Sequence, residues 1–237
     1  MDNNMKLDEH TSQRYNAELE AVRNRVLTMG GLVEKQCRQA LQALLKGDAE
    51  LASEVDGADY EVNDLEIEIS DRCTEILARR QPAAGDLRMI VAVIRMVSNL
   101  ERIGDEAAKI GRKARKLADA RDRQAYAGES VHLGEGVLQM LHGALDAFAR
   151  LDVQAAVEII SRDLEIDREF KSLNRLLISH MMEQPQRVKN MLRVNSCARA
   201  LERIGDHAVN LCEEVVYLVR GADVRHLSAE EIKRHHQ

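Results

Sequence analysis

Two pairs of acidic residues recur in this chain at a spacing of about one helix turn. Glu101 and Asp105, and 101 positions later Glu202 and Asp206, are the second and sixth residues of the same hexamer, Leu-Glu-Arg-Ile-Gly-Asp. Residues four apart project from one side of a helix, so each pair can present two carboxylates to a neighbouring helix. Carboxylates that converge between helices supply the oxygen ligands that hard cations prefer. Metal binding is therefore the first chemical hypothesis.

Other polar positions could complete such a site. Asp163 and Asp167 are again four apart, and the positions 104 residues before them hold Asp59 and Asn63. A metal shared within a helical bundle needs ligands from a second helix, which these pairs would provide. Glu213 extends the acidic side of the helix that carries the second hexamer.

A competing interpretation needs no metal. At 100° per residue, the main apolar stripe runs through Leu100 and Ile103, while Glu101 and Asp105 lie on its flank. Carboxylates half-buried on such a flank repel one another unless something neutralises them. Nearby arginines could do so, and the candidates are Arg102, Arg112 and Arg203.

Three further residues beside the acidic pairs have roles that remain open. Gly104 and Gly205 either allow a neighbouring helix to approach closely or are simply small packing residues. His207 could add a nitrogen ligand, but it points about 100° away from Asp206, which favours a surface histidine.

The elements that must position these residues are long helices. Only 3% of the residues are aromatic and 2 are Pro, a composition that favours an all-α fold. Apolar residues recur every three, four or seven positions between breaks rich in Gly, Pro and Asp. The pattern predicts helices over residues 15–46, 49–80, 87–123, 130–150, 153–183 and 187–220, followed by a polar tail.

The breaks between these helices repeat as well. Gly47-Asp48 is expected to end one helix and cap the next, and Leu151-Asp152 is expected to do the same 104 residues later. The dipeptide Gln-Pro marks a second equivalent break in each half, at 81–82 and at 184–185.

Short breaks between long helices require neighbouring helices to run antiparallel. The chain therefore predicts two three-helix bundles in tandem, over residues 1–126 and 127–237.

Composition also limits the classes of partner and the location. A net charge of −6 argues against nucleic-acid binding. The 4 cysteines lie apart within helical patterns, where Cys is usually a small buried hydrophobe, as suits a reducing cytoplasm. No apolar run reaches the roughly 18 residues of a membrane span, and the N-terminus lacks a signal-peptide pattern. A soluble, cytoplasmic protein is expected.

A basic cluster marks the end of the third predicted helix. Cations suit the negative end of a helix dipole, so a solvated helix end is the simpler reading, and a docking patch for an acidic partner or membrane surface is the alternative. The cluster consists of Arg112, Lys113, Arg115, Lys116, Arg121 and Arg123.

Enzyme chemistry finds little support in the motifs. The sequence contains no phosphate-binding Gly-rich loop with Lys and no ordered Ser/His/Asp group, and it lacks the two Glu-x-x-His motifs that the di-iron carboxylate bundles supply from two helices. We therefore expect no enzyme activity. The alternatives are a metal-dependent enzyme of the carboxylate-bundle type and a metal-free structural interaction module.

The doubled hexamer, the Asp-Leu-Arg at 86–88 that follows Gln81-Pro82, and the two three-helix halves together resemble the PhoU family of phosphate-signalling proteins. The resemblance covers nearly the whole chain. It implies two tandem three-helix bundles and Glu/Asp-x-x-x-Asp motifs that bind clusters of iron, zinc, manganese or magnesium. By position, those motifs fall on Glu101 and Asp105, Glu202 and Asp206, Asp163 and Asp167, and Asp59 and Asn63.

The resemblance also implies a role and an asymmetry. Asn63 is a neutral and poorer ligand than a carboxylate, so the half with Asp163 and Asp167 should hold metal better. The implied role is that of a cytoplasmic regulator that links a phosphate ABC importer to a sensor histidine kinase and represses the phosphate regulon. Family members of this kind are expected to form homodimers and to reach the membrane only peripherally, through those partners.

Overall fold

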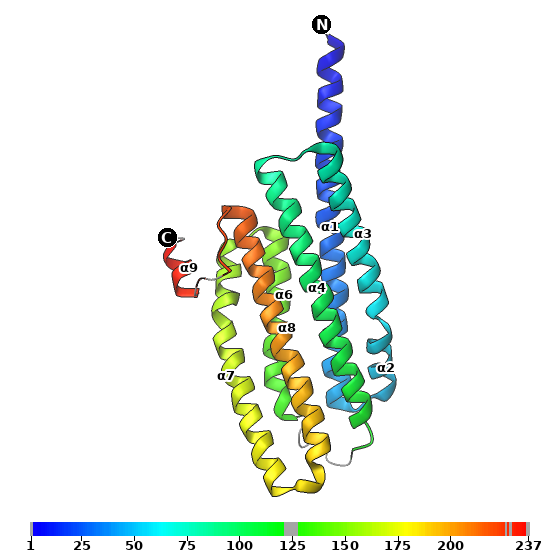
Figure 1. The fold of residues 1–237 in the computed structure, drawn as a ribbon, viewed down its shortest axis with the longest axis vertical. Coiled ribbons are helices and arrows are strands. Elements are labelled where there is room, and N and C mark those ends of the chain that lie inside the picture. Colours follow the sequence, from blue (N-terminus) through cyan, green and yellow to red (C-terminus); the bar gives the residue numbers. More distant parts are fainter. Residues whose placement is uncertain (1, 121–127, 226, 228, 236–237) are drawn as a thin grey trace.

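Long helices account for almost all of the regular structure (Figure 1). The computed structural model describes residues 2–120, 128–225, 227 and 229–235. Its helices are α1 (Asp2–Lys46), α2 (Ala49–Gly57), α3 (Asp59–Arg80), α4 (Ala84–Leu117), α6 (Val131–Arg150), α7 (Val153–Glu183), α8 (Val188–Arg220) and α9 (Ala229–His235), with 3-10 turns η1 (Gly128–Ser130) and η2 (Pro185–Arg187). The all-α prediction is confirmed.

The helices form two antiparallel groups of the same design. α1, α2 with α3, and α4 make the first half, and α6, α7 and α8 make the second. In Figure 1 the loop from α3 to α4 lies at one end of the molecule and the loop from α7 to α8 at the opposite end. The predicted boundary between residues 126 and 127 lies outside the described residues.

The second predicted helix, over residues 49–80, is interrupted. The structure turns at Ala58, which separates α2 from α3 and donates its backbone N–H to the carbonyl oxygen of Glu54 at 3.0 Å. Gly57 immediately precedes this turn, and glycine is among the weakest helix formers. The equivalent helix of the second half, α7, is continuous and has Ser161 at the matching position.

Some helix ends differ from the prediction. α4 ends at Leu117 rather than at residue 123, and Arg121 and Arg123 lie outside the described residues. α1 starts at Asp2, well before residue 15. The tail is not only polar, because α9 forms there and buries Ile232 completely.

The predicted turn-and-cap sequences are confirmed. Gly47 has a φ of 67°, and the Asp48 carboxylate accepts hydrogen bonds from the amides of Glu50 and Leu51, at 3.1 and 3.0 Å. Leu151 adopts the same left-handed conformation, with a φ of 54°, and the Asp152 carboxylate accepts from the amide of Ala155 at 3.0 Å. The repeat therefore preserves the turn even where a non-glycine residue must adopt a positive φ.

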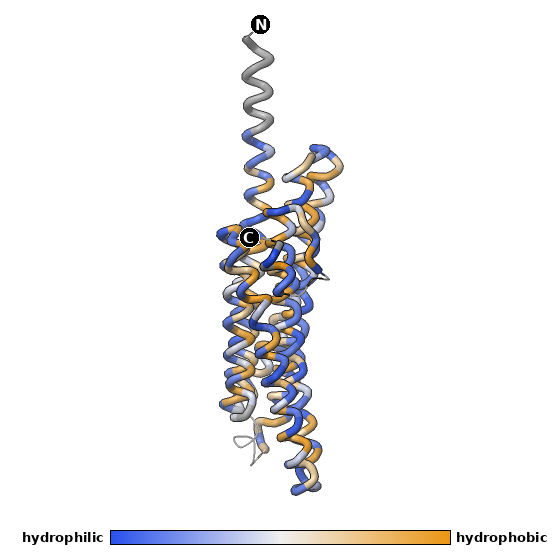
Figure 2. The backbone as a smooth tube through the Cα atoms, turned by 90° about the vertical axis from the view of Figure 1, so that its left-hand side faces the viewer, coloured by the Kyte–Doolittle hydropathy of each residue, from blue (hydrophilic) through white to orange (hydrophobic). Residues whose placement is uncertain are grey.

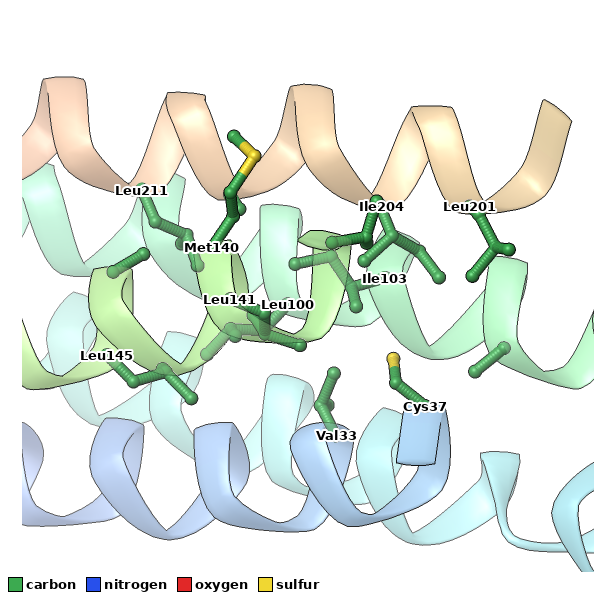
Figure 3. Close-up of a cluster of buried hydrophobic side chains, with 14 of the residues drawn as sticks. Val33, Cys37, Leu100, Ile103, Met140, Leu141, Leu145, Leu201, Ile204 and Leu211 are labelled. Atoms are coloured by element: carbon green, nitrogen blue, oxygen red, sulfur yellow. The ribbon is translucent and has the colours of Figure 1, made fainter. Parts of the chain in front are cut away.

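One hydrophobic core runs through both halves. Hydrophobic and hydrophilic residues alternate along the helices in Figure 2, as a period of 3.6 residues requires. In Figure 3, side chains of α1, α4, α6 and α8 meet in a single cluster. The cysteines are all buried and unpaired, as predicted. No helix in the described part of the chain is both long and apolar enough to cross a membrane.

Candidate functional site

The two hexamers lie on α4 and α8, which pack against each other more extensively than any other pair of described elements. Their apolar residues meet in the core, where Leu100 and Ile103 of α4 and Leu201 and Ile204 of α8 are at most 2% exposed (Figure 3). The acidic residues are consequently turned to the flanks of the two helices, as the helical angles predicted.

The second half brings four predicted carboxylates together. Asp163 and Asp167 on α7 face Glu202 and Asp206 on α8 closely enough for each helix to perturb the other's titration. Burial raises the pKa of Asp163 to about 6, and Asp206 and Asp167 add to the shift. Desolvation likewise raises the pKa of Asp206 to about 6, with further contributions from Glu202 and Asp167.

Glu213 extends this acidic cluster by two turns of α8. Burial raises its pKa to about 7, followed by repulsion from Glu214, and Asp163 adds a smaller effect. The pKa of Glu202 is also raised, first by burial, although Arg199 and Arg203 oppose the shift. We call Asp163, Asp167, Glu202, Asp206 and Glu213 the α7–α8 acidic cluster.

The α7–α8 acidic cluster suits a cation by its charge. Raised pKa values mean that negative charge is poorly compensated, and a divalent cation would compensate it. As the side chains stand, no three acidic, His or Cys groups within the described residues converge closely enough to enclose a metal ion. Binding would therefore require the carboxylates to turn toward a shared ion.

The surface beside the first hexamer, where α4 meets α8, carries basic as well as acidic side chains. An open pocket of about 390 Å³ lies beside the first hexamer. Asn63 lies on α3, and its buried side-chain oxygen has no hydrogen-bond partner among the described residues. The side chain of Asp59 lies outside the described residues. The pocket is lined by Glu101, Arg102, Asp105, Glu106, Lys109, Arg203 and His207.

Two of the arginines proposed to neutralise the hexamer carboxylates pair elsewhere. Arg112 donates to Asp56 of α2 at 2.9 Å rather than to Asp105, and Arg203 pairs with Glu106 at 3.2 Å. These arginines therefore connect neighbouring helices instead of simply compensating the acidic pairs.

Glu106 was missed by sequence reasoning, although it directly follows the first hexamer. It is only 6% exposed and is held by Lys109 of its own helix at 2.9 Å and by Arg203 of α8. Its place on the helix next to the apolar stripe was the available signal. A second buried glutamate, Glu214, faces Arg95 at 3.5 Å across the same interface.

His207 is not the surface histidine that was favoured. Its ring is half-buried between α4 and α8, with Nδ1 3.0 Å from the side-chain oxygen of Asn99. Asn210 donates to the same oxygen at 3.0 Å. Burial lowers the pKa of His207, and Arg102 and Arg203 lower it further. A polar network therefore joins the halves beside the hexamers.

Gly205 does not mark an unusually close helix approach. A Cβ atom there would lie 3.6 Å from Ile166 and 3.8 Å from Val137, which are ordinary van der Waals distances. Gly111, later on α4, is different, because a Cβ would come within 2.9 Å of the carbonyl oxygen of Ala52. At Gly111, therefore, α4 approaches the backbone of α2 closely.

Comparison with known proteins gives matches over nearly the whole chain. The PhoU domain model matches residues 26–114 and again 131–215. A Pseudomonas putida protein named phosphate-specific transport system accessory protein PhoU homolog is 47% identical over 232 residues, which are 98% of this chain and 91% of the relative. The Escherichia coli K12 protein named phosphate-specific transport system accessory protein PhoU is 41% identical over 97% of this chain and 95% of its own.

Solved structures show the same fold. A crystal structure of PhoU from Pseudomonas aeruginosa superimposes with a TM-score of 0.85 at 47% identity, covering 88% of this chain and 100% of that one. The crystal structure of the phosphate transport system regulatory protein PhoU from Streptococcus pneumoniae gives a TM-score of 0.82 at 29% identity, covering 89% and 99%.

Proposed function

Because this chain belongs to the PhoU family, we propose that it is a non-enzymatic cytoplasmic regulator of phosphate uptake. The observation that carries the proposal is full-length similarity in both directions. The Pseudomonas putida relative, whose name places it in a phosphate-specific transport system, aligns over 98% of this chain and 91% of itself. Because the alignment spans nearly all of both sequences, the same role is the simplest expectation.

The finer proposal is that the protein connects a phosphate ABC importer to a sensor histidine kinase and represses the phosphate regulon when phosphate is plentiful. Long helices with charged outer faces offer extended surfaces for two partners at once, which an adaptor needs. A homodimer would double those surfaces.

A complementation experiment tests this role. The gene would be expressed in a Pseudomonas putida strain that lacks its own relative, and phosphate uptake and a phosphate-starvation reporter would be measured in phosphate-rich medium. We expect both to return to their low wild-type values. A strain that makes the protein in soluble form but stays derepressed would contradict the proposal. Co-purification with the importer's ATPase subunit and with the kinase's cytoplasmic part tests the adaptor role separately.

We also propose that the α7–α8 acidic cluster binds a metal ion, with iron, zinc, manganese and magnesium as the candidates. The support is physical: burial and mutual repulsion raise the pKa values of Asp163 and Asp206, and a cation would relieve that repulsion. Asp163, Asp167, Glu202 and Asp206 would be ligands, and the ion would hold α7 to α8. Glu101, Asp105, Asp59 and Asn63 would form the weaker site of the first half.

Metal analysis of purified protein tests this second proposal. Wild-type protein would be prepared without chelator, beside the variants Glu202→Ala/Asp206→Ala and Glu101→Ala/Asp105→Ala. We expect the first variant to lose more bound metal than the second. Equal metal content in all three proteins, or none after reconstitution with each candidate ion, would remove the metal site.

A further inference from the structure

A second charged site lies far from the hexamers, in a groove between α1 and α3. The groove has a volume of about 230 Å³. Its walls carry five arginines and three glutamates, so its formal charge is positive although the whole chain is negative at −6. We call it the α1–α3 groove, lined by Arg14, Glu18, Ala21, Val22, Arg25, Glu68, Ile69, Arg72, Glu75, Ile76, Arg79 and Arg80.

The α1 wall of the α1–α3 groove has no counterpart in α6, the helix of the second half that corresponds to α1. α6 begins at Val131, whose counterpart 104 residues earlier is Leu27. The groove residues of α1 lie at 14–25 and so precede the part of the helix that the repeat duplicates. They also precede residue 26, where the first match to the PhoU domain model begins.

The glutamates of the groove hold part of its arginines in place. Arg80 donates to both carboxylate oxygens of Glu18, at 3.1 and 2.8 Å, in a partly buried fork. Arg25 pairs with Glu68 at 2.9 Å across the groove. Guanidinium groups fixed in this way are preorganised, which lowers the entropic cost of binding an anion.

The groove has more arginines than glutamates, and its excess positive charge is carried mainly by Arg72 and Arg14. Within the described part of the chain, Arg72 makes no ion pair, although its field helps to lower the pKa of Glu18 after Arg80 and Arg14. Arg14 lies 3.5 Å from Glu18, a carboxylate that already accepts from Arg80, and is 78% exposed. Both guanidinium groups therefore have hydrogen-bonding capacity for a ligand.

The dimensions restrict the ligand. The volume of about 230 Å³ lies below the 300–1,000 Å³ of typical drug-sized sites, so a ligand held within the groove must be small. Along the helices, at 1.5 Å per residue, Arg14 and Arg25 nevertheless lie about 16 Å apart on α1, and Arg72 and Arg80 lie about 12 Å apart on α3. A ligand that reaches several of them must be small, elongated and charged at more than one point.

We propose that the α1–α3 groove binds a small anion that carries two or more linked phosphoryl groups. Arginine forks match phosphoryl oxygens in geometry and charge, and Arg72 and Arg14 supply the free donors. A free oligophosphate and the triphosphate tail of a nucleotide share this chemistry. The site is separate from the α7–α8 acidic cluster and does not depend on it.

Isothermal titration of the full chain with tripolyphosphate, in buffer without divalent cations, tests the site. Loss of one charge-assisted contact is expected to weaken binding about tenfold in Arg72→Gln and in Arg14→Gln. Glu75→Gln should tighten binding, because Glu75 occupies Arg79 at 2.8 Å. Arg38→Gln is the matched control, since Arg38 is also an exposed arginine in a helical ion pair, but on a distant part of α1.

The outcomes are distinct. Tight binding of ATP as well would identify the triphosphate tail as the recognised group, and binding of tripolyphosphate alone would identify a free oligophosphate. The proposal fails if wild-type protein binds neither, if orthophosphate binds as tightly as tripolyphosphate, or if Arg38→Gln weakens binding as much as Arg72→Gln. Thermal unfolding of each variant would verify that the protein is still folded, so that weaker binding reflects the missing arginine.

Discussion

Asp163 shows how a single carboxylate can connect stability, pH and ligand binding in this protein. It lies on α7, partly buried, among Asp206, Asp167 and Glu213, and its pKa of about 6 reflects burial first and repulsion second. A group in this position stabilises the fold when it is neutral and opposes it when ionised. At neutral pH it therefore favours any cation that binds nearby.

We expect Asp163→Asn to stabilise the metal-free protein at pH 7.5 by about 1 kcal/mol. The full shift would correspond to about 3 kcal/mol, but partial exposure and coupling to Asp206 screen it. Between the ordinary pKa of 3.8 and the folded value of about 6, the folded state holds more protons than the unfolded state. Stability from this group is thus complete below about pH 4 and is lost as the pH rises through 6.

Urea unfolding in the presence of chelator, at pH 4 and at pH 7.5, measures this difference. The variant and the wild type should differ at pH 7.5 and converge at pH 4. A variant that is less stable at pH 7.5, or whose advantage is independent of pH, would show that the Asp163 carboxylate is well compensated in the fold.

Asn63 stands where the second half has Asp167, and this one difference suggests why the halves should differ in metal binding. We expect Asn63→Asp to raise the metal content of the first half, because an anionic oxygen would replace a neutral one. The side-chain oxygen of Asn63 is buried and finds no hydrogen-bond partner in the described part of the chain, so it is available to a ligand. Competition titrations against a metal indicator, with Asp167→Asn as the reverse substitution, would measure the change.

Metal affinity that is unaltered by Asn63→Asp and by Asp167→Asn would show that neither position contributes to a metal site. Affinity that rises in the first variant and falls in the second would instead establish that the α3 and α7 positions are equivalent in function.

At the scale of single elements, glycine positions distinguish tight helix contacts from loose ones. We expect Gly111→Ala to destabilise the fold by about 1 to 3 kcal/mol, because the new Cβ would lie 2.9 Å from the backbone oxygen of Ala52 and 3.1 Å from Val55. Gly205→Ala should instead stabilise it by up to about 1 kcal/mol, since alanine is the better helix former and the space exists.

Thermal unfolding of the two variants, measured against wild type under the same conditions, checks both signs. Each variant is the control for the other, because both add one methyl group to a buried helical glycine. Destabilisation by Gly205→Ala would mean that the second hexamer needs glycine for a reason other than local space.

Sequence periodicity predicted most elements because long amphipathic helices have a strong and regular signal. α7 begins and ends where the pattern placed it, and α6 and α8 each differ from the predicted bounds by one residue at the N-terminal end. The break at Ala58 was missed, since one glycine in an otherwise helical pattern is normally tolerated. α9 was missed because it is short and because the burial of Ile232 in the core depends on the tertiary structure.

The candidate site was predictable only in part. Spacing identified the acidic pairs, and the structure brings those of α7 and α8 together. Sequence spacing could not identify the buried Glu106 or the contact of His207 with Asn99, because both depend on how α4 crosses α8. Sequence spacing also could not assign the ion-pair partner of Arg112, because that partner, Asp56, lies on another helix.

At the scale of the whole molecule, duplication has produced two similar halves that share one core. α4 and α8 are equivalent helices, and their contact is the central interface of the described structure. Ion pairs that involve a buried glutamate cross it, such as Glu106 with the exposed Arg203. Such pairs contribute little net stability but restrict how the halves can dock. The two halves should therefore behave as one unit.

We expect Ile103→Ala to destabilise both halves together by about 2 to 5 kcal/mol, because Ile103 is fully buried where α4 meets the second half (Figure 3). Ile94→Ala is the matched control: the same change on the same helix, at a side chain 37% exposed, should cost much less. Native-state hydrogen exchange would follow amides in α1 and in α6. A shared core requires protection to fall equally in both helices, whereas loss confined to α1 would mean that each half unfolds independently.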